Sequence, residues 1–404
     1  MDWSNLNEIL KFASIPFVAA FVGWTTNWLA IKLTFYPIEF MGIRPIFGWQ
    51  GIIPSKAKKM AIISVDSTLA KLGTVSEIIE HMDPKIISTH ILNNIAPRNE
   101  ELVDEIMLKR YKTLWQNLPK TLKKIVYQRV SENIPIIMDE LIEDITPKIE
   151  SLFDLKLMVI DKLEEDKTLL NKIFLSCGDH EFKFIIKSGL WFGFLFGIPQ
   201  LALWYFFPLP WILPLCGFLV GWATNWVALN MIFRPVKKFN FLGLTIHGLF
   251  LKRQDEVSAS FCKIITEEVI TVNQVVHAML SGPSAARTRA IIQKHFECLV
   301  DEAAGVIKPL TQVVMGPKGF AEIKEETGYK AIDISTNILG DKLFNQQRAF
   351  AVQKIMEERM KQLPSEEFQN LLRPCFQEDE IKLIIIGGIL GALAGLGQLV
   401  YLFG

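Results

Sequence analysis

The sequence predicts an all-α integral membrane protein with four transmembrane helices, arranged as two tandem parallel repeats that each carry a helical cytoplasmic region. Two observations lead to this prediction. Four apolar windows have a length of about 20 residues, which is the length that crosses ~30 Å of hydrocarbon. A motif near the start of the chain also recurs in its second half, which is typical of an internal repeat.

The composition favours a membrane protein. Of 404 residues, 50% are hydrophobic and 21% are charged, and 43 basic residues balance 43 acidic residues. The mean hydropathy of +0.27 is unusual for a soluble globular protein. The apolar content excludes an intrinsically disordered chain, and the missing basic excess disfavours a nucleic-acid-binding protein.

The apolar windows predict the domain boundaries. We expect transmembrane helices at residues 12–36, 185–207, 211–233 and 383–403, and helical cytoplasmic regions at residues 37–184 and 234–382. A cleaved signal peptide is the main alternative for the first window, but Asp2 and Glu8 give the preceding segment the wrong charge for one.

The repeat is visible in three places. Residues 23–37 read GWTTNWLAIKLTFYP and residues 221–235 read GWATNWVALNMIFRP, with eight of fifteen positions identical at an offset of 198. Residues 102–105 and residues 299–302 both read Leu-Val-Asp-Glu, at an offset of 197. The third match joins Gly189, Gly193, Gly197 and Gln200 to Gly387, Gly391, Gly395 and Gln398. Because each repeat crosses the membrane twice, both should have the same orientation, related by a pseudo-two-fold axis along the membrane normal.

Apolar spacing predicts the structure of the cytoplasmic regions. In Lys59–Met82, apolar residues at intervals of three, four and seven predict one amphipathic helix; they are Val65, Leu69, Leu72, Ile79 and Met82. Similar spacing relates Leu114 and Leu118. Prolines between these segments favour several helices of ordinary length, and we expect no strands outside the loops.

Three motifs together resemble a known family. They are GWxTNWxAxxxxFxP in each repeat, FGWxGIIPxK from Phe47 to Lys56, and GGxxGxxxGxxQ from Gly387 to Gln398. In this combination the chain resembles the bacterial YheB/YjiN-type membrane proteins, which share a domain of unknown function numbered 445. The resemblance covers both ends and the duplicated middle. It implies a multi-pass protein of the bacterial cytoplasmic (inner) membrane with a helical soluble part, and it implies no chemistry.

The repeated motif contains the main candidates for ligand binding or packing. They are Trp24, Asn27, Trp28 and Pro37 in the first repeat and Trp222, Asn225, Trp226 and Pro235 in the second. An asparagine amide inside hydrocarbon needs a hydrogen-bond partner. We favour an interhelical bond, with Gln200 or Gln398 as the partner. The alternative is a polar contact that lines a pathway.

Small residues at every fourth position let a second helix approach closely. The helix-packing candidates are therefore Gly189, Gly193, Gly197 and Gln200, with Gly387, Gly391, Gly395 and Gln398. Whether the partner helix belongs to the same chain or to another subunit stays open at this point.

The segment after each first helix is rich in aromatic residues and glycine and ends in basic residues, as expected at a membrane interface. The candidates are Trp49, Lys56, Lys58, Lys59, Lys252 and Arg253. An ordinary loop packed on the soluble region is the alternative.

Catalytic patterns are sparse. Cys177 stands near His180 in the sequence, but no third residue completes a nucleophilic or metal-binding set. The chain has no phosphate-binding loop or hydrolase motif. We expect no enzyme activity, no cofactor and no metal site.

Three functions are compatible with these patterns. We favour a membrane-anchored helical scaffold that contacts membrane lipids, forms a homo-oligomer through its glycine rows and presents its helices to a cytoplasmic protein partner. The alternatives are a transporter or channel with Asn27 and Asn225 at the pseudo-symmetry axis, and a lipid-binding or lipid-transfer protein whose amphipathic helices enclose an acyl chain. Nucleic acid is not an expected partner.

Basic residues after the first and third helices predict cytoplasmic soluble regions. In intact cells, a cysteine that replaces Lys58 or Lys252 should be protected from a membrane-impermeant thiol reagent, whereas one that replaces Leu209 should react. The opposite labelling pattern would reverse the orientation.

Overall fold

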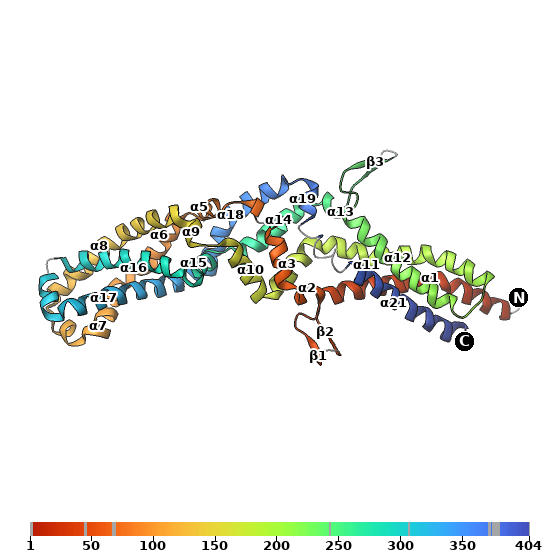
Figure 1. Cartoon of the computed structure of the whole chain (residues 1–404), viewed down its shortest axis with the longest axis horizontal. Coiled ribbons are helices and arrows are strands. Elements are labelled where there is room, and N and C mark those ends of the chain that lie inside the picture. Colours follow the sequence, from red (N-terminus) through yellow and green to blue (C-terminus); the bar gives the residue numbers. More distant parts are fainter. Residues whose placement is uncertain are drawn as a thin grey trace. The chain divides into compact units, whose positions relative to one another are not determined.

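The computed structural model describes residues 3–43, 47–66, 70–241, 244–305, 308–370, 373 and 380–403. These residues are nearly all helical (Figure 1). Four candidate membrane spans lie at Leu10–Phe35, Lys167–Phe206, Ile212–Ile232 and Glu380–Tyr401. The predicted all-α class and the four apolar helices are thereby confirmed.

The chain forms two compact units, and each half of the chain contributes to both. Unit 1 comprises Met1–Lys71, Ile160–Cys262 and Glu357–Gly404. Unit 2 comprises Leu72–Val159 and Lys263–Met356. The beginning and the end of each expected cytoplasmic region therefore belong to the same unit as the apolar helices.

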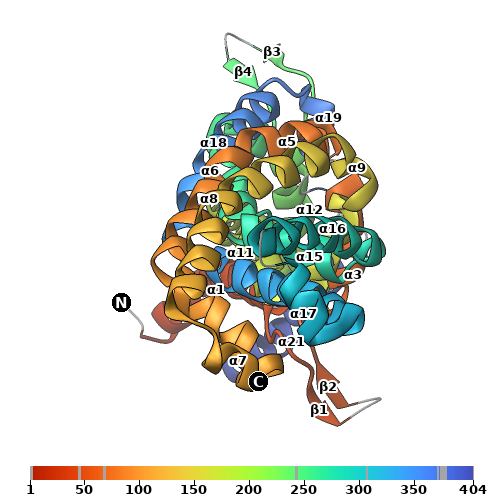
Figure 2. The same ribbon diagram turned by 90° about the vertical axis from the view of Figure 1, so that its left-hand side faces the viewer.

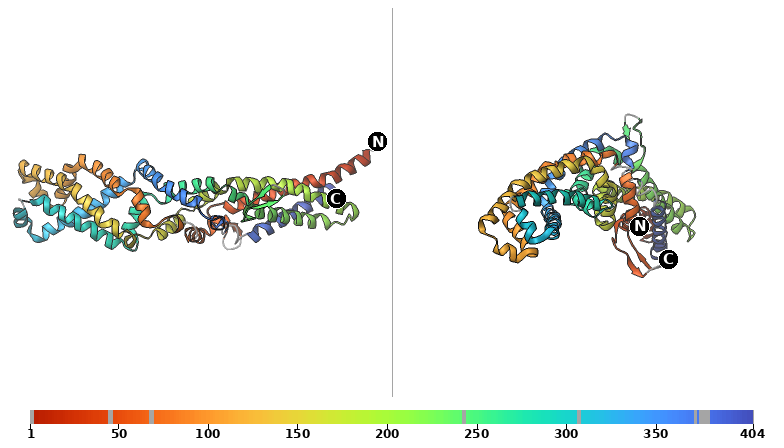
Figure 3. Two further views of the ribbon diagram at one scale, coloured as in Figure 1. Left: turned by 90° about the horizontal axis from the view of Figure 1, so that it is seen from above. Right: turned by 60° about the vertical axis from the view of Figure 1, so that its left-hand side comes forward.

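The long helices of unit 1 are α1 (Trp3–Phe35), α11 (Lys167–Phe206), α12 (Ile212–Phe233) and α21 (Glu380–Gln398). They lie side by side in the views of Figures 1 and 3, with α1 along α11 and α12 along α21. Helix α11 begins well before residue 185, where the apolar window begins. Its first turn is capped by Asp166, whose side chain accepts a hydrogen bond from the Thr168 N–H at 2.9 Å.

Two short antiparallel hairpins follow α1 and α12. They are β1 (Met41–Ile43) with β2 (Phe47–Trp49), and β3 (Phe239–Phe241) with β4 (Leu244–Ile246). The Gly51 N–H donates to the Pro37 carbonyl at 2.8 Å, and the Gly248 N–H donates to the Pro235 carbonyl at 3.0 Å. Both strand pairs thus lie in the loops, and a backbone hydrogen bond closes the base of each.

Shorter helices complete unit 1. They are α2 (Ile52–Ser55), α3 (Ala57–Ser64), α13 (Leu249–Lys252), α14 (Gln254–Ile264), α19 (Ser365–Gln369) and the π-helical turn η6 (Leu399–Phe403). The points at which the chain passes between the units lie in α4 (Ala70–Leu72), α10 (Leu155–Glu165) and α18 (Lys342–Lys361), and near the end of α14.

Unit 2 is a bundle of helices from both halves of the chain, and Figure 2 labels α6 and α8 of the first half and α16 and α17 of the second. The first half contributes α5 (Val75–Met82), α6 (Pro84–Ile95), η2 (Ala96–Arg98), α7 (Asn99–Asn117), α8 (Lys120–Ile145), η3 (Thr146–Lys148) and α9 (Ile149–Leu152). The second half contributes η4 (Ile265–Val269), α15 (Val272–Ser281), α16 (Ala285–Ala304) and α17 (Lys308–Leu339). Helix α16 packs against both α8 and α17.

The single amphipathic helix expected over Lys59–Met82 is wrong, because among the described residues of this segment α4 ends at Leu72 and α5 begins at Val75. The Thr74 hydroxyl accepts a hydrogen bond from the Glu77 N–H, and the Glu77 carboxylate accepts one from the Thr74 N–H at 2.9 Å. This reciprocal pair starts a new helix at Val75. The apolar residues Val65, Leu72, Ile79 and Met82 are nevertheless buried, while Leu69 lies outside the described residues.

The glycine rows bring the backbones of paired helices together within the chain. A Cβ on Gly193 would lie 2.5 Å from the Ala19 carbonyl oxygen of α1, and one on Gly197 would lie 2.6 Å from the Pro16 Cα. In the other pair, a Cβ on Gly391 would overlap the Gly217 carbonyl oxygen of α12. The partner helices left open by the sequence are therefore α1 for the row on α11 and α12 for the row on α21.

Substitution of Gly391 by leucine should lower the Tm of the detergent-solubilised protein by several degrees, because overpacking of this kind costs about 1–3 kcal/mol. The same substitution at Gly397 is the matched control, since a Cβ there meets no atom within 4 Å. Thermal unfolding followed by circular dichroism measures both. Equal Tm values for the two variants would show that close approach at Gly391 contributes nothing.

Candidate functional site

The asparagine of the first motif bridges two apolar helices. Asn27 is fully buried, and its Nδ2 donates to the backbone carbonyl of Ile185 on α11 at 2.7 Å. The partner is therefore a main-chain carbonyl rather than Gln200 or Gln398. Gly189 leaves the space for this amide, because a Cβ there would lie 2.7 Å from Asn27 Nδ2.

The second motif places its asparagine in the same way. Asn225 is 3% exposed, and a Cβ on Gly387 would overlap its Nδ2. Gln200 and Gln398 are also buried, and neither Gln200 Oε1 nor Gln398 Nε2 has a hydrogen-bond partner among the described residues. The structure thus places each asparagine against the glycine row of the paired helix, and Asn27 Nδ2 bonds to Ile185 rather than to a glutamine.

The tryptophans of the motifs point away from the asparagines. Trp24, Trp28, Trp222 and Trp226 are between 37% and 47% exposed. The Trp222 and Trp226 rings stack at 6.2 Å between centroids, and Lys32 Nζ lies 5.0 Å from the centroid of the Trp28 ring. These side chains form the outer surface of α1 and α12, where they meet the surroundings of the helices.

Several of the expected interface residues make contacts inside unit 1. Trp49 Nε1 donates to the Leu33 carbonyl of α1 at 3.2 Å, and Lys58 Nζ lies 3.0 Å from Glu164 Oε2. Arg253 donates through Nη1 to both carboxylate oxygens of Glu181, at 2.9 and 2.8 Å.

The other basic residues of this set differ in exposure. Lys59 and Lys252 are exposed, and Lys56 is half-buried. Glu181 is 3% exposed. Arg253 therefore forms its ion pair with a buried carboxylate rather than with a lipid headgroup.

Cys177 and His180 do not form a reactive pair. The cysteine is fully buried in unit 1, whereas the histidine is exposed. Within the part of the chain that the structure describes, no group of three or more His, Cys, Asp or Glu residues is placed to hold a metal ion.

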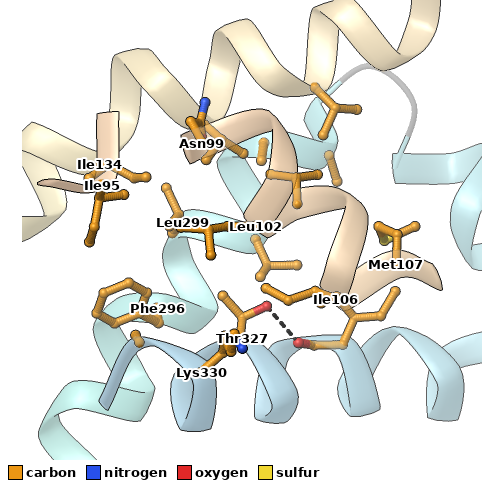
Figure 4. A pocket seen from close by; sticks show the side chains of 18 of the residues that line it. Ile95, Asn99, Leu102, Ile106, Met107, Ile134, Phe296, Leu299, Thr327 and Lys330 are labelled. Carbon is orange, nitrogen blue, oxygen red and sulfur yellow. Dashed lines mark hydrogen bonds between the residues drawn. The ribbon is translucent and has the colours of Figure 1, made fainter. Parts of the chain in front are cut away.

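Unit 2 contains two apolar cavities that sequence reasoning did not identify. Cavity 1 has a volume of about 220 Å³ and is lined by α6, α7, α8, α16 and α17 (Figure 4). Cavity 2 has a volume of about 170 Å³ and also involves α5, α9 and α15. Met138, Phe296 and Ala331 line both. The polar members of the cavity 1 lining are Asn99, Thr327 and Lys330.

Much of the lining of cavity 1 comes from positions that are paired between the two halves of unit 2. Each pair is separated by 197 residues: Asn99 and Phe296, Leu102 and Leu299, Val103 and Val300, Ile106 and Ala303, Met107 and Ala304, Val126 and Ile323, Val130 and Thr327, and Ile134 and Ala331. In three of these pairs the second half has alanine where the first has a large side chain. The smaller side chains leave space that the larger ones would fill.

The two cavities follow the long helices. Lining residues on α8 run from Val126 to Ile145, and those on α17 run from Phe320 to Leu339. Each stretch has a rise of roughly 28 Å at 1.5 Å per residue. The two cavities therefore adjoin along these helices, where they share Met138, Phe296 and Ala331.

A half-buried carboxylate, Asp104, stands next to the cavity 1 lining residue Val103 in α7. Asp104 Oδ1 accepts hydrogen bonds from Trp115 Nε1 at 2.6 Å and from the Tyr127 hydroxyl at 2.5 Å. Burial and the Asp104 carboxylate raise the pKa of Tyr127, so its phenol stays protonated as a donor. Trp115 itself lines the cavity and is 3% exposed. This cluster ties α7 to α8.

Comparisons with known protein families, with curated proteins and with solved structures found no match. The resemblance to the YheB/YjiN-type proteins therefore stays a prediction from motifs, and the geometry of the chain itself carries the functional argument.

Replacing Asn27 by leucine should cost about 1 kcal/mol of unfolding free energy, the typical value of an interhelical hydrogen bond in a membrane. Asn27→Asp should cost more, because a buried carboxyl next to the Ile185 carbonyl must keep its proton or ionise without a partner. Thermal unfolding of both variants, and of the same changes at Asn225, provides the measurement. Stability like that of the unaltered protein in both aspartate variants would favour a water-filled pathway.

Proposed function

We propose that this is a membrane-anchored lipid-binding protein in which unit 2 holds acyl chains. The observation that carries the proposal is the pair of adjoining apolar cavities between the two halves of unit 2. The four apolar helices of unit 1 supply the anchor. Membrane lipids, which the sequence suggests as partners, are the ligands that this arrangement fits.

An unfilled apolar space is energetically costly, because the side chains around it lose packing contacts. Spaces lined in this way exclude water and accept apolar molecules. An apolar occupant would therefore restore stability that the alanines of α16 and α17 remove.

The dimensions favour an acyl chain. The hydrocarbon of one bilayer leaflet is ~15 Å thick, half of the ~30 Å core. The lining of cavity 1 on α8 extends from Val126 to Met138, roughly 18 Å at 1.5 Å per residue, which matches the length of an acyl chain in one leaflet.

The other two functions have less support. The scaffold interpretation depends on glycine rows that contact other subunits, and these rows face α1 and α12 of the same chain. The channel interpretation depends on solvated asparagines, and the Asn27 amide is buried and hydrogen-bonded. A homo-oligomer and a cytoplasmic protein partner stay predictions of the sequence, as do the bacterial inner membrane and the cytoplasmic side.

The tandem duplication is part of the proposal. Its support comes from the sequence offsets, from hairpins after both α1 and α12, and from cavity residues that pair at an offset of 197. Under a pseudo-two-fold relationship, cavity 1 lies where the equivalent surfaces of the two halves meet.

Filling cavity 1 tests the proposal. The full chain in nanodiscs is exposed to a fatty acid with a diazirine near its terminal carbon, and crosslinked peptides are mapped by mass spectrometry. We expect labelling of α7, α8, α16 and α17 in the unaltered protein. Ala303→Leu should abolish most of this labelling with an unchanged or higher Tm, because cavity filling commonly adds about 0.5–2 kcal/mol.

The matched control is Ala321→Leu, at an exposed position of α17 outside both cavities. This variant should label like the unaltered protein. Absence of labelling in unit 2 of the unaltered protein, or full labelling of Ala303→Leu, would contradict acyl-chain binding in cavity 1.

A further inference from the structure

We infer that lipid reaches cavity 1 through the α7–α17 seam, the line along which α7 and α17 lie side by side, and that polar side-chain pairs keep this seam closed. The inference rests on the proposed function, and it identifies the part of unit 2 that must open for a chain to pass.

Three polar pairs cross the seam among the described residues. Lys330 Nζ donates to Glu105 Oε1 at 2.6 Å, Lys109 donates to Glu326, and the Tyr111 hydroxyl lies 3.5 Å from Glu322 Oε2. On both helices the ion-pair partners are four residues apart, so they lie on one face. The side chains of Glu105 and Lys109 are 52% and 62% exposed, and those of their partners Lys330 and Glu326 are 25% and 15% exposed. Water can therefore reach the outer member of each pair when the two helices separate.

Cavity space lies directly behind these pairs. Leu102 and Ile106 of α7 line cavity 1 on one side, and Thr327 and Lys330 of α17 line it on the other (Figure 4). Separating the two helices would therefore break few apolar contacts, because their inner side chains already border a space. The seams of α16 are different, since α16 meets α8 and α17 over much longer stretches than α7 meets α17.

The construction of α7 favours opening at this seam. At Tyr111 the helix is interrupted by non-helical backbone angles of φ −131° and ψ 47°. Asp104 joins Trp115, which follows the interruption, to Tyr127 of α8. Asn99 Nδ2 also donates to the Tyr127 carbonyl at 2.9 Å. These bonds hold α7 to α8 at Tyr127, so α7 can turn about this cluster and leave α17 while α8 stays packed against α16.

A reversible crosslink tests the inference. Glu105→Cys and Lys330→Cys are combined in a full-length protein in which Cys298, which is exposed, and Cys375, which lies outside the described residues, are replaced by serine. A short bis-methanethiosulfonate reagent then bridges the two cysteines. Uptake is measured as the rate of photolabelling of unit 2 by the diazirine fatty acid.

Bridging should slow uptake by roughly tenfold or more, as expected when a gating segment is locked, and a reductant should restore the rate in the same sample. The control bridges Glu140→Cys to His295→Cys across α8 and α16, where His295 Nδ1 and Glu140 Oε2 lie 3.9 Å apart. This bridge should leave uptake unchanged.

An unchanged rate after bridging α7 to α17, or slowing only by the control bridge, would overturn the assignment of this seam. Failure of the proposed function is distinguishable, because the unbridged protein would then show no labelling of unit 2 at all.

Discussion

The close approach of paired helices in unit 1 is the constraint on which the rest of the structure depends. Glycines on α11 and α21 let these helices touch the backbones of α1 and α12, and the same glycines leave the space in which Asn27 and Asn225 lie. Helix α1 precedes the segment Leu72–Val159 and α11 follows it, and these two helices pack against each other. In the same way, α12 precedes Lys263–Met356 and α21 follows it, and these two helices also pack together. Each half of unit 2 is therefore inserted between two helices that pack together.

The interior of unit 2 combines two requirements that usually conflict. Stability favours a filled core, because dense packing supplies most of the apolar contacts. The alanines at 303, 304 and 331 line cavity 1, and the corresponding positions of the other half have larger residues. An apolar core with unfilled space can hold another apolar molecule, which then fills that space. The difference between the two halves, rather than their similarity, creates the cavity.

Much of unit 1 could be predicted from the sequence, because its features are local. Window length identified the four apolar helices, and the four-residue spacing of Gly189 and Gly193 identified the packing face. The hydrogen-bond partner of Asn27 could not be predicted, since a backbone carbonyl leaves no residue-specific signal. The helix start at Val75 did have a signal, the Thr74-x-x-Glu77 capping pattern, but apolar periodicity masked it. The cavities depend on how side chains 197 residues apart fill a shared space. Comparison of Ile106 with Ala303 and of Ile134 with Ala331 is the signal that could have found them.

The length of α11 has a mechanical consequence. Its 40 residues form one continuous helix, which is roughly 60 Å long at 1.5 Å per residue. The hydrocarbon core of a bilayer is ~30 Å thick, so about half of this helix stands outside it. The outer half includes the buried Glu181 that pairs with Arg253. Because the helix is continuous at the bilayer surface, the whole helix tilts when the bilayer thickness changes. Its end at Lys167 would then be displaced together with the span.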